Sequence, residues 1–113
     1  TCREVAELSY GKELVAAIKD DPLVGEVAQG LRLYCSTTRE DYPFRGRITD
    51  LMASGKVFDD LGVPPISPET DRGMICGSME MLRDTKAALE EFGLVEGSNS
   101  RPDTFVVERA FVD

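Results

Sequence analysis

Histidine and tryptophan are absent from this chain of 113 residues, and cysteine occurs only three times. Because no imidazole is available, the chain cannot form a Ser-His-Asp triad or a histidine-ligated zinc site, and any proton transfer falls to carboxylates, Tyr, Lys or Cys. Cys2, Cys35 and Cys76 are odd in number and widely spaced, which predicts neither a disulfide framework nor a Cys-x-x-Cys metal site. We therefore expect no metal site and a reducing, cytoplasmic environment.

Long apolar runs are missing as well. No stretch approaches the roughly 20 apolar residues that cross a bilayer, and the first residues lack the basic and apolar regions of a secretory signal. The net charge of −8 argues against nucleic acid or an anionic membrane as a partner. With 42% hydrophobic and 30% charged residues, the composition is that of one globular domain with a modest core.

Positive charge is concentrated in one stretch of this acidic chain, residues 38–47. Its arginines are Arg39, Arg45 and Arg47. Guanidinium groups are planar, forked donors that suit phosphate oxygens, so the stretch is a candidate phosphate site. The alternative is a solvated loop in which these arginines pair with nearby carboxylates such as Glu40 and Asp41, because exposed ion pairs are common.

Helical spacing of apolar residues dominates the first part of the chain. Residues 4–19 repeat apolar side chains with a helical period, Thr1 and Glu4 match a capping box, and an Asp-Asp-Pro sequence ends the run. Residues 31–37 then alternate apolar and polar side chains, which predicts a strand with Cys35 in the core.

Short helices and strands are expected to alternate through the rest of the chain. The expected elements are helices at 48–52, 57–61 and 78–92 and strands at 74–75 and 104–112. Gly55 and Gly62 end the first two helices, and Ser78 is a credible N-cap for the third. Met74 and Ile75 are expected to be buried.

Strands that alternate with helices predict an α/β fold with a parallel sheet and helical crossovers. Ligands bind such sheets beyond the carboxyl ends of the strands, where a helix often begins. Cys76-Gly77-Ser78 stands at such a strand-to-helix turn and is a candidate site. Three predicted strands would leave a sheet edge unpaired, so either the chain pairs with another partner or it is the C-terminal piece of a larger protein. We expect the second, because the chain begins with a helix and no preceding strand.

Three separated motifs resemble the bacterial ferredoxin (flavodoxin)–NADP⁺ reductases. They are the segment 38–51, the Met-Ile-Cys-Gly-Ser-x-x-Met-Leu run at 74–82 and the ending Val-Val-Glu-Arg-Ala-Phe-Val at 106–112. The resemblance implies a doubly wound parallel five-stranded sheet flanked by helices, of which residues 1–113 form part of the NADP(H)-binding domain. The FAD-binding barrel, the first strand–helix units and the glycine-rich pyrophosphate loop would lie in an N-terminal part outside this chain, so the chain alone is expected to be inactive.

The resemblance also implies the two ends of an NADP(H) site. Arg39 and Arg47 match the arginines that grip the 2′-phosphate, with Thr38 beside them, and Arg3 resembles a further arginine near the nucleotide phosphates. Cys76 matches the cysteine that lines the nicotinamide pocket and positions the ring. The remaining implied contacts are Gly77, Ser78 and Asp84 for the nucleotide and Ala110 and Phe111 for FAD.

The function implied is that of a flavin-dependent oxidoreductase. It would move hydride between NADPH and FAD, and single electrons to or from ferredoxin or flavodoxin. The alternative is a non-enzymatic phosphate- or nucleotide-binding α/β domain with a structural Cys76; a thiol enzyme would lack a histidine base. Glu108 would add charge near the flavin, Arg45 is expected to be solvated, and the acidic Glu40 and Asp41 leave a preference for NADH open.

Overall fold

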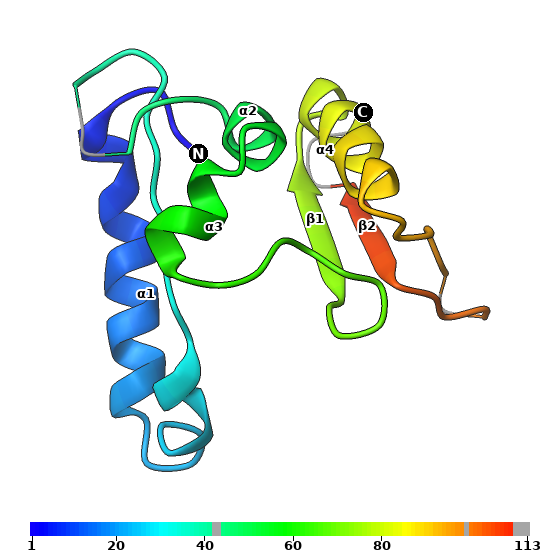
Figure 1. Ribbon diagram of the computed structural model, residues 1–113. Coiled ribbons are helices and arrows are strands. Elements are labelled where there is room, and N and C mark those ends of the chain that lie inside the picture. The colour runs from blue at the N-terminus through cyan, green and yellow to red at the C-terminus, as the bar shows by residue number, and fades with distance from the viewer. Residues whose placement is uncertain (42–43, 99, 110–113) are drawn as a thin grey trace. The chain divides into compact units, whose positions relative to one another are not determined.

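A computed structural model describes residues 1–41, 44–98 and 100–109, which fall into two units, Thr1–Ile48 and Thr49–Asp113 (Figure 1). The first unit consists of a 3₁₀ turn, η1 (Val5–Leu8), the helix α1 (Ser9–Asp20) and a second 3₁₀ turn, η2 (Val27–Gly30), which packs back against α1. The helix predicted over 4–19 is thus confirmed, with a 3₁₀ first turn. It ends at Asp20, just before Asp21 and Pro22, as expected.

The capping box predicted from Thr1 and Glu4 is wrong. The carboxylate of Glu7 accepts the backbone N–H groups of Arg3 at 2.9 Å and of Glu4 at 3.1 Å. The Thr1 hydroxyl instead bonds the Ser36 hydroxyl at 2.8 Å. Two acidic residues three positions apart both match the motif, and only the folded chain shows which one reaches the free N–H groups.

The strand predicted over 31–37 is also wrong, although its end does pair. Cys2 donates to the Ser36 carbonyl and Thr38 donates to the Cys2 carbonyl, both at 3.0 Å, which gives an isolated parallel bridge rather than a ladder. Leu33 remains 44% exposed and Cys35 is half-buried, so the expected core position of Cys35 is not observed. An alternating pattern predicts extended backbone, but a strand also needs a neighbouring strand to bond.

The second unit begins within the short helix α2 (Ile48–Ala53), after its first residue, and continues into a second short helix, α3 (Lys56–Leu61). Gly55 and Gly62 adopt the left-handed conformation with φ of 82° and 68°, so they separate and end these helices as predicted. The Phe58 ring packs edge-on against the Phe92 ring with centroids 5.6 Å apart. This contact ties α3 to the residue at which the next helix ends.

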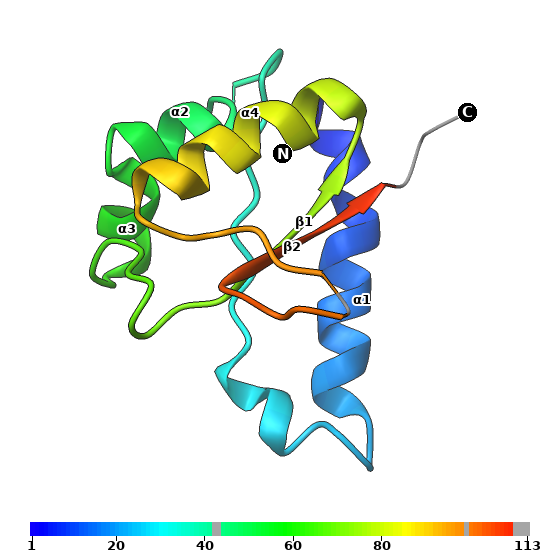
Figure 2. The same ribbon diagram turned by 90° about the vertical axis from the view of Figure 1, so that its right-hand side faces the viewer.

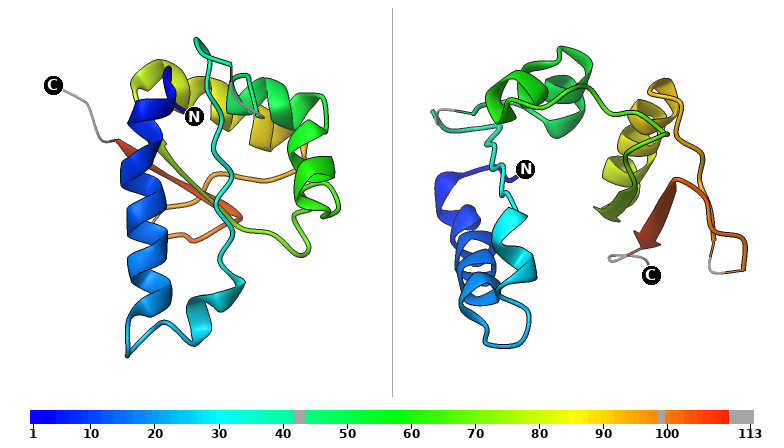
Figure 3. Two further views of the ribbon diagram at one scale, coloured as in Figure 1. Left: turned by 90° about the vertical axis from the view of Figure 1, so that its left-hand side faces the viewer. Right: turned by 60° about the horizontal axis from the view of Figure 1, so that its bottom comes forward.

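A parallel strand pair with a helical crossover forms the rest of the second unit, which confirms the α/β class. The strands β1 (Gly73–Gly77) and β2 (Phe105–Arg109) pair in parallel, and α4 (Met79–Glu91) packs against them (Figure 2). Figure 3 shows the same arrangement from two further directions. The core between helix and sheet consists of Ile75, Leu82, Leu89, Leu94 and Phe105, each at most 8% exposed.

The face of the strand pair turned away from this core is open. Ile75 is buried as predicted, whereas Met74 is 79% exposed because alternate strand residues point to opposite faces. Within the described part of the chain, β1 and β2 are the only ladder-forming strands, two rather than the predicted three. The predicted last strand at 104–112 is confirmed over Phe105–Arg109, and residues 110–112 lie outside the described residues.

Candidate functional site

Thr37 is the residue around which the arginine-bearing segments of the first unit gather. Its backbone forms one parallel bridge with Cys2 and a second with Arg45. The Gly46 N–H donates to the Thr37 carbonyl at 2.8 Å and closes the second bridge. The segment at Cys2 and the two segments at Thr37 and Arg45 therefore lie side by side at this double bridge, an arrangement that the sequence alone does not predict.

The register of the second bridge relates the two arginines expected at the 2′-phosphate. Thr37 pairs with Arg45 in an isolated bridge, and Arg39 and Arg47 each follow two residues after the bridged residue. Both arginines are exposed, and Thr38 between the bridge and Arg39 is half-buried. The number of residues between Arg39 and Arg47 is therefore the same as the number between the bridged residues Thr37 and Arg45.

The arginines near the double bridge differ in their partners. The Arg39 N–H donates to the Arg3 carbonyl at 2.9 Å, so these two residues are neighbours. The Arg3 guanidinium pairs with Glu7 at 3.3 Å, and the Arg45 guanidinium pairs with Asp41 at 2.9 Å. Among the described residues, the Arg39 guanidinium has no hydrogen-bond or ion-pair partner, and it is therefore available to an anionic ligand.

Glu7 contacts Arg3, and the sequence patterns considered above did not predict this pair. Its carboxyl pKa is held below the usual value by the donated N–H groups of Glu4 and Arg3, with a further contribution from the Arg3 guanidinium. Glu7 is therefore ionised at neutral pH and fixes the backbone of Arg3. The four-residue spacing between Arg3 and Glu7 is the signal that would have found this pair.

Cys76 lies exposed at the carboxyl end of β1, where the sequence places a ligand site. In the parallel register Cys76 pairs with Glu108 of β2, so a thiol and a carboxylate stand on adjacent strands. The Ser78 hydroxyl accepts the Met81 N–H at 3.3 Å and caps α4, as predicted. The strand-to-helix turn is therefore observed at the expected residues.

Gly77 brings the end of β1 close to the first turn of α4. A Cβ at this position would lie 2.7 Å from the Cγ atom of Met81. A larger residue would fit only if this flexible methionine side chain moved, so glycine allows the close strand-to-helix approach.

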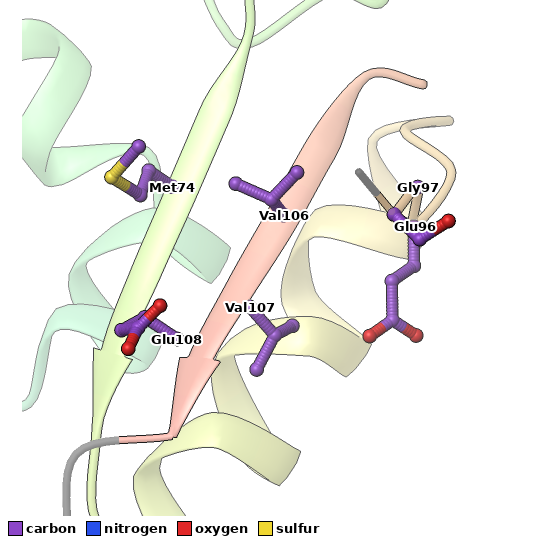
Figure 4. A pocket seen from close by; sticks show the side chains of 7 residues that line it. Met74, Glu96, Gly97, Val106, Val107 and Glu108 are labelled. Atoms are coloured by element: carbon purple, nitrogen blue, oxygen red, sulfur yellow. The ribbon is translucent and has the colours of Figure 1, made fainter. Parts of the chain in front are cut away.

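A shallow pocket of about 390 Å³ is lined by residues of both strands and of the loop 96–98. Met74, Val106 and Glu108 come from the strands and Glu96 from the loop after α4, as Figure 4 shows. Glu96 pairs with Lys86 at 2.7 Å. With the Glu108 carboxylate and apolar side chains from both strands in its lining, the pocket suits an apolar group better than a phosphate.

The other predicted site residues are placed as follows. Asp84 is half-buried in α4, two turns after the cap of that helix. Ala110 and Phe111 lie outside the described residues. Over residues 1–41, 44–98 and 100–109 there is no group of His, Cys, Asp or Glu side chains that could hold a metal, and none of the described helices is long and apolar enough to cross a membrane.

The chain is similar to several reductases. It is 57% identical over 112 residues to the flavodoxin/ferredoxin–NADP reductase of Rhodobacter capsulatus and 46% identical over 112 residues to ferredoxin–NADP reductase A of Sorangium cellulosum. These matches cover 98% of this chain but only 42% and 40% of the relatives, so the chain spans about two fifths of their length. A crystal structure of a ferredoxin NADP⁺ reductase from Neisseria gonorrhoeae with bound FAD and NADP matches 96% of this chain and 42% of that one, with a TM-score of 0.75 and 27% identity. No protein-family model matches the chain.

Proposed function

We propose that this chain, which is homologous over nearly all of its length to the bacterial ferredoxin–NADP reductases, forms the later part of the NADP(H)-binding domain of such an enzyme. Residues 1–113 supply this part of the domain, and the FAD-binding barrel and first strand–helix units belong to the remainder of the protein. The reductase activity is accordingly an activity of the whole protein. Its electron partners are ferredoxin or flavodoxin.

The first unit binds the 2′-phosphate of NADP(H). The observation that supports this assignment is the double bridge at Thr37, because Arg39 and Arg47 each follow two residues after the bridged pair Thr37 and Arg45. Guanidinium groups suit phosphate oxygens, and Arg39 has no protein partner among the described residues that a phosphate would have to displace. Thr38 lies beside Arg39, and Arg3 is the third arginine of the site.

The turn after β1 receives the nicotinamide end. Cys76 presents its thiol on the open face of the strand, Gly77 allows a close backbone approach, and Ser78 begins the helix. The role of Cys76 is to position the ring, since hydride transfer needs reacting atoms about 3–3.5 Å apart and aligned. Glu108, opposite Cys76, adds negative charge at this point.

The cofactors supply the redox chemistry: NADP(H) and FAD exchange hydride, and the flavin passes single electrons to the protein partner. The residues of this chain bind these cofactors and orient their reacting rings. Asp84 would contribute to nucleotide binding from α4, and Ala110 and Phe111 would lie against the FAD.

The test is the substitution of Arg39 and Arg47 by alanine in the full-length protein. The 2′-phosphate distinguishes NADPH from NADH, and a charge-assisted contact contributes about 1.5–3 kcal/mol before solvent screening, so we expect KM for NADPH to rise about 10- to 100-fold. KM for NADH should change little. Steady-state kinetics with both dinucleotides measures the difference.

The matched control is Arg45→Ala, which removes the same charge from the same loop. Because Arg45 is paired with Asp41, we expect KM for NADPH to change by less than about threefold. Equal increases for NADPH and NADH, or an equal effect of the control, would contradict the 2′-phosphate assignment. A full-length protein without flavin absorption would contradict the reductase function itself.

A further inference from the structure

Glu40 follows Arg39 in sequence, but its carboxylate bonds a different part of the first unit. We propose that Glu40 is a positioning residue for the 2′-phosphate site, because it anchors the turn that carries Arg39. This inference rests on the proposed function. An acidic residue beside a phosphate-binding arginine would ordinarily oppose the phosphate, so the contacts that Glu40 makes decide its effect.

The Glu40 carboxylate accepts the backbone N–H of Val5, the first residue of η1. The backbone carbonyl of Glu40 accepts the Thr37 hydroxyl at 2.9 Å. Glu40 is therefore bonded through its side chain to the start of the helix and through its backbone to the residue at the double bridge. A hydrogen bond to an ionised acceptor is stronger than one between neutral groups, so the side-chain contact is the more important of the two.

Arg39 lies inside the turn that these bonds close. Its own N–H donates to the Arg3 carbonyl at 2.9 Å, and Thr38 donates to the Cys2 carbonyl at 3.0 Å. The backbone of the turn is thus fixed at successive residues, whereas the Arg39 guanidinium is exposed and has no partner among the described residues. Fixing the backbone of a phosphate ligand lowers the entropy lost on binding, which is how a residue that does not touch the nucleotide raises affinity.

Because the Glu40 carboxylate is bonded to the Val5 N–H, it does not pair with the Arg39 guanidinium. A carboxylate released from this bond would lie next to the arginine in sequence and would compete with the phosphate for its donors. Asp41 offers a matched comparison, because it is the neighbouring acidic residue, pairs only with Arg45 among the described contacts and has a side chain 98% exposed. The two carboxylates have the same charge and different structural positions.

The experiment compares Glu40→Ala, Glu40→Gln and Asp41→Asn in the full-length protein. Removing an exposed charge-assisted bond should raise KM for NADPH about three- to tenfold in Glu40→Ala, with kcat and KM for NADH within about twofold of the parent. Glu40→Gln keeps an oxygen that accepts the Val5 N–H, so it should restore KM for NADPH to within about twofold of the parent. Asp41→Asn removes the same charge from the loop and should leave KM for NADPH unchanged or lower it.

A double substitution tests whether Glu40 acts through Arg39. In an Arg39→Ala background, Glu40→Ala should have no further effect on KM for NADPH, since the residue that it positions is gone. If Glu40→Ala and Glu40→Gln both lower KM for NADPH, Glu40 is only a repelling charge and the proposal is overturned. It is also overturned if Glu40→Ala has no effect although Arg39→Ala does. An Arg39→Ala variant with unchanged KM for NADPH would refute the proposed function instead. Thermal unfolding of each variant shows whether it is folded, and Glu40→Gln keeps the comparison informative if Glu40→Ala is not.

Discussion

The cap of α4 allows a prediction whose size follows from the structure. The Ser78 hydroxyl accepts the Met81 N–H at 3.3 Å, near the long end of hydrogen-bond distances, and the bond is solvent-exposed. Ser78→Ala leaves this N–H to water, so the loss should be at the low end of the range for N-caps, about 0.5–1 kcal/mol. In a full-length protein of the size of the relatives, this corresponds to a fall in Tm of about 1–4 °C.

The assay is thermal or urea unfolding of the full-length protein, with Ser9→Ala as the matched control. The Ser9 hydroxyl donates to the Ala6 carbonyl of η1 at 3.2 Å and accepts no backbone N–H, so its loss should change stability by less than about 0.5 kcal/mol. Ser78→Asp retains a cap and should restore Tm, while its added negative charge should raise KM for NADPH if Ser78 faces the nucleotide. A Ser78→Ala protein as stable as the parent, or a Ser9→Ala protein equally destabilised, would refute the capping argument.

Two further outcomes are expected in the full-length protein. Cys76→Ser should lower the hydride-transfer rate measured by stopped-flow absorbance about tenfold and leave the Kd for NADPH largely unchanged, because a positioning role affects ring alignment more than affinity; an unchanged rate would remove Cys76 from the site. Gly25→Ala would place a Cβ 2.4 Å from the Lys19 carbonyl oxygen and 2.5 Å from that of Asp21, and should cost about 1–3 kcal/mol of unfolding free energy. Gly30→Ala has no atom within 4 Å of the added carbon and should be neutral to within about 0.5 kcal/mol, so equal losses for the two glycines would contradict this steric account.

The sequence correctly predicted those helices whose caps and apolar spacing involve residues close together in the chain. Ser78 and the helix that follows it could be predicted because a cap and an apolar period lie within a few residues of each other. The segment 31–37 could not, because a ladder depends on a neighbouring strand, and the described backbone pairs only the end of the segment. The exposure of Met74 was missed for a similar reason, since a short apolar run does not show which face of a strand is covered.

In the candidate site, too, some features can be predicted from the sequence and others are seen only in the folded chain. The spacing of Arg39 and Arg47 and the turn at Cys76 are visible in the sequence, whereas the double bridge at Thr37 joins segments that only the folded chain brings together. The roles of these residues toward the cofactors remain predictions. The bond from Glu40 to Val5 lies outside sequence reasoning altogether, because a carboxylate that directly follows Arg39 would be assigned to that arginine or to Arg45 in the same loop.

The parallel pairing of β1 and β2 has a consequence for the order of folding. Parallel neighbours cannot form as a hairpin, so Cys76 and Glu108 become neighbours only after the chain between them has crossed over through α4. Helices form faster than such long-range strand pairs, which places the pairing late in folding. The thiol and the carboxylate therefore meet only when the buried side of α4, including Leu82 and Leu89, has found the sheet. We therefore expect the rate at which the proposed nicotinamide end of the site forms to depend on packing on the opposite side of the strands.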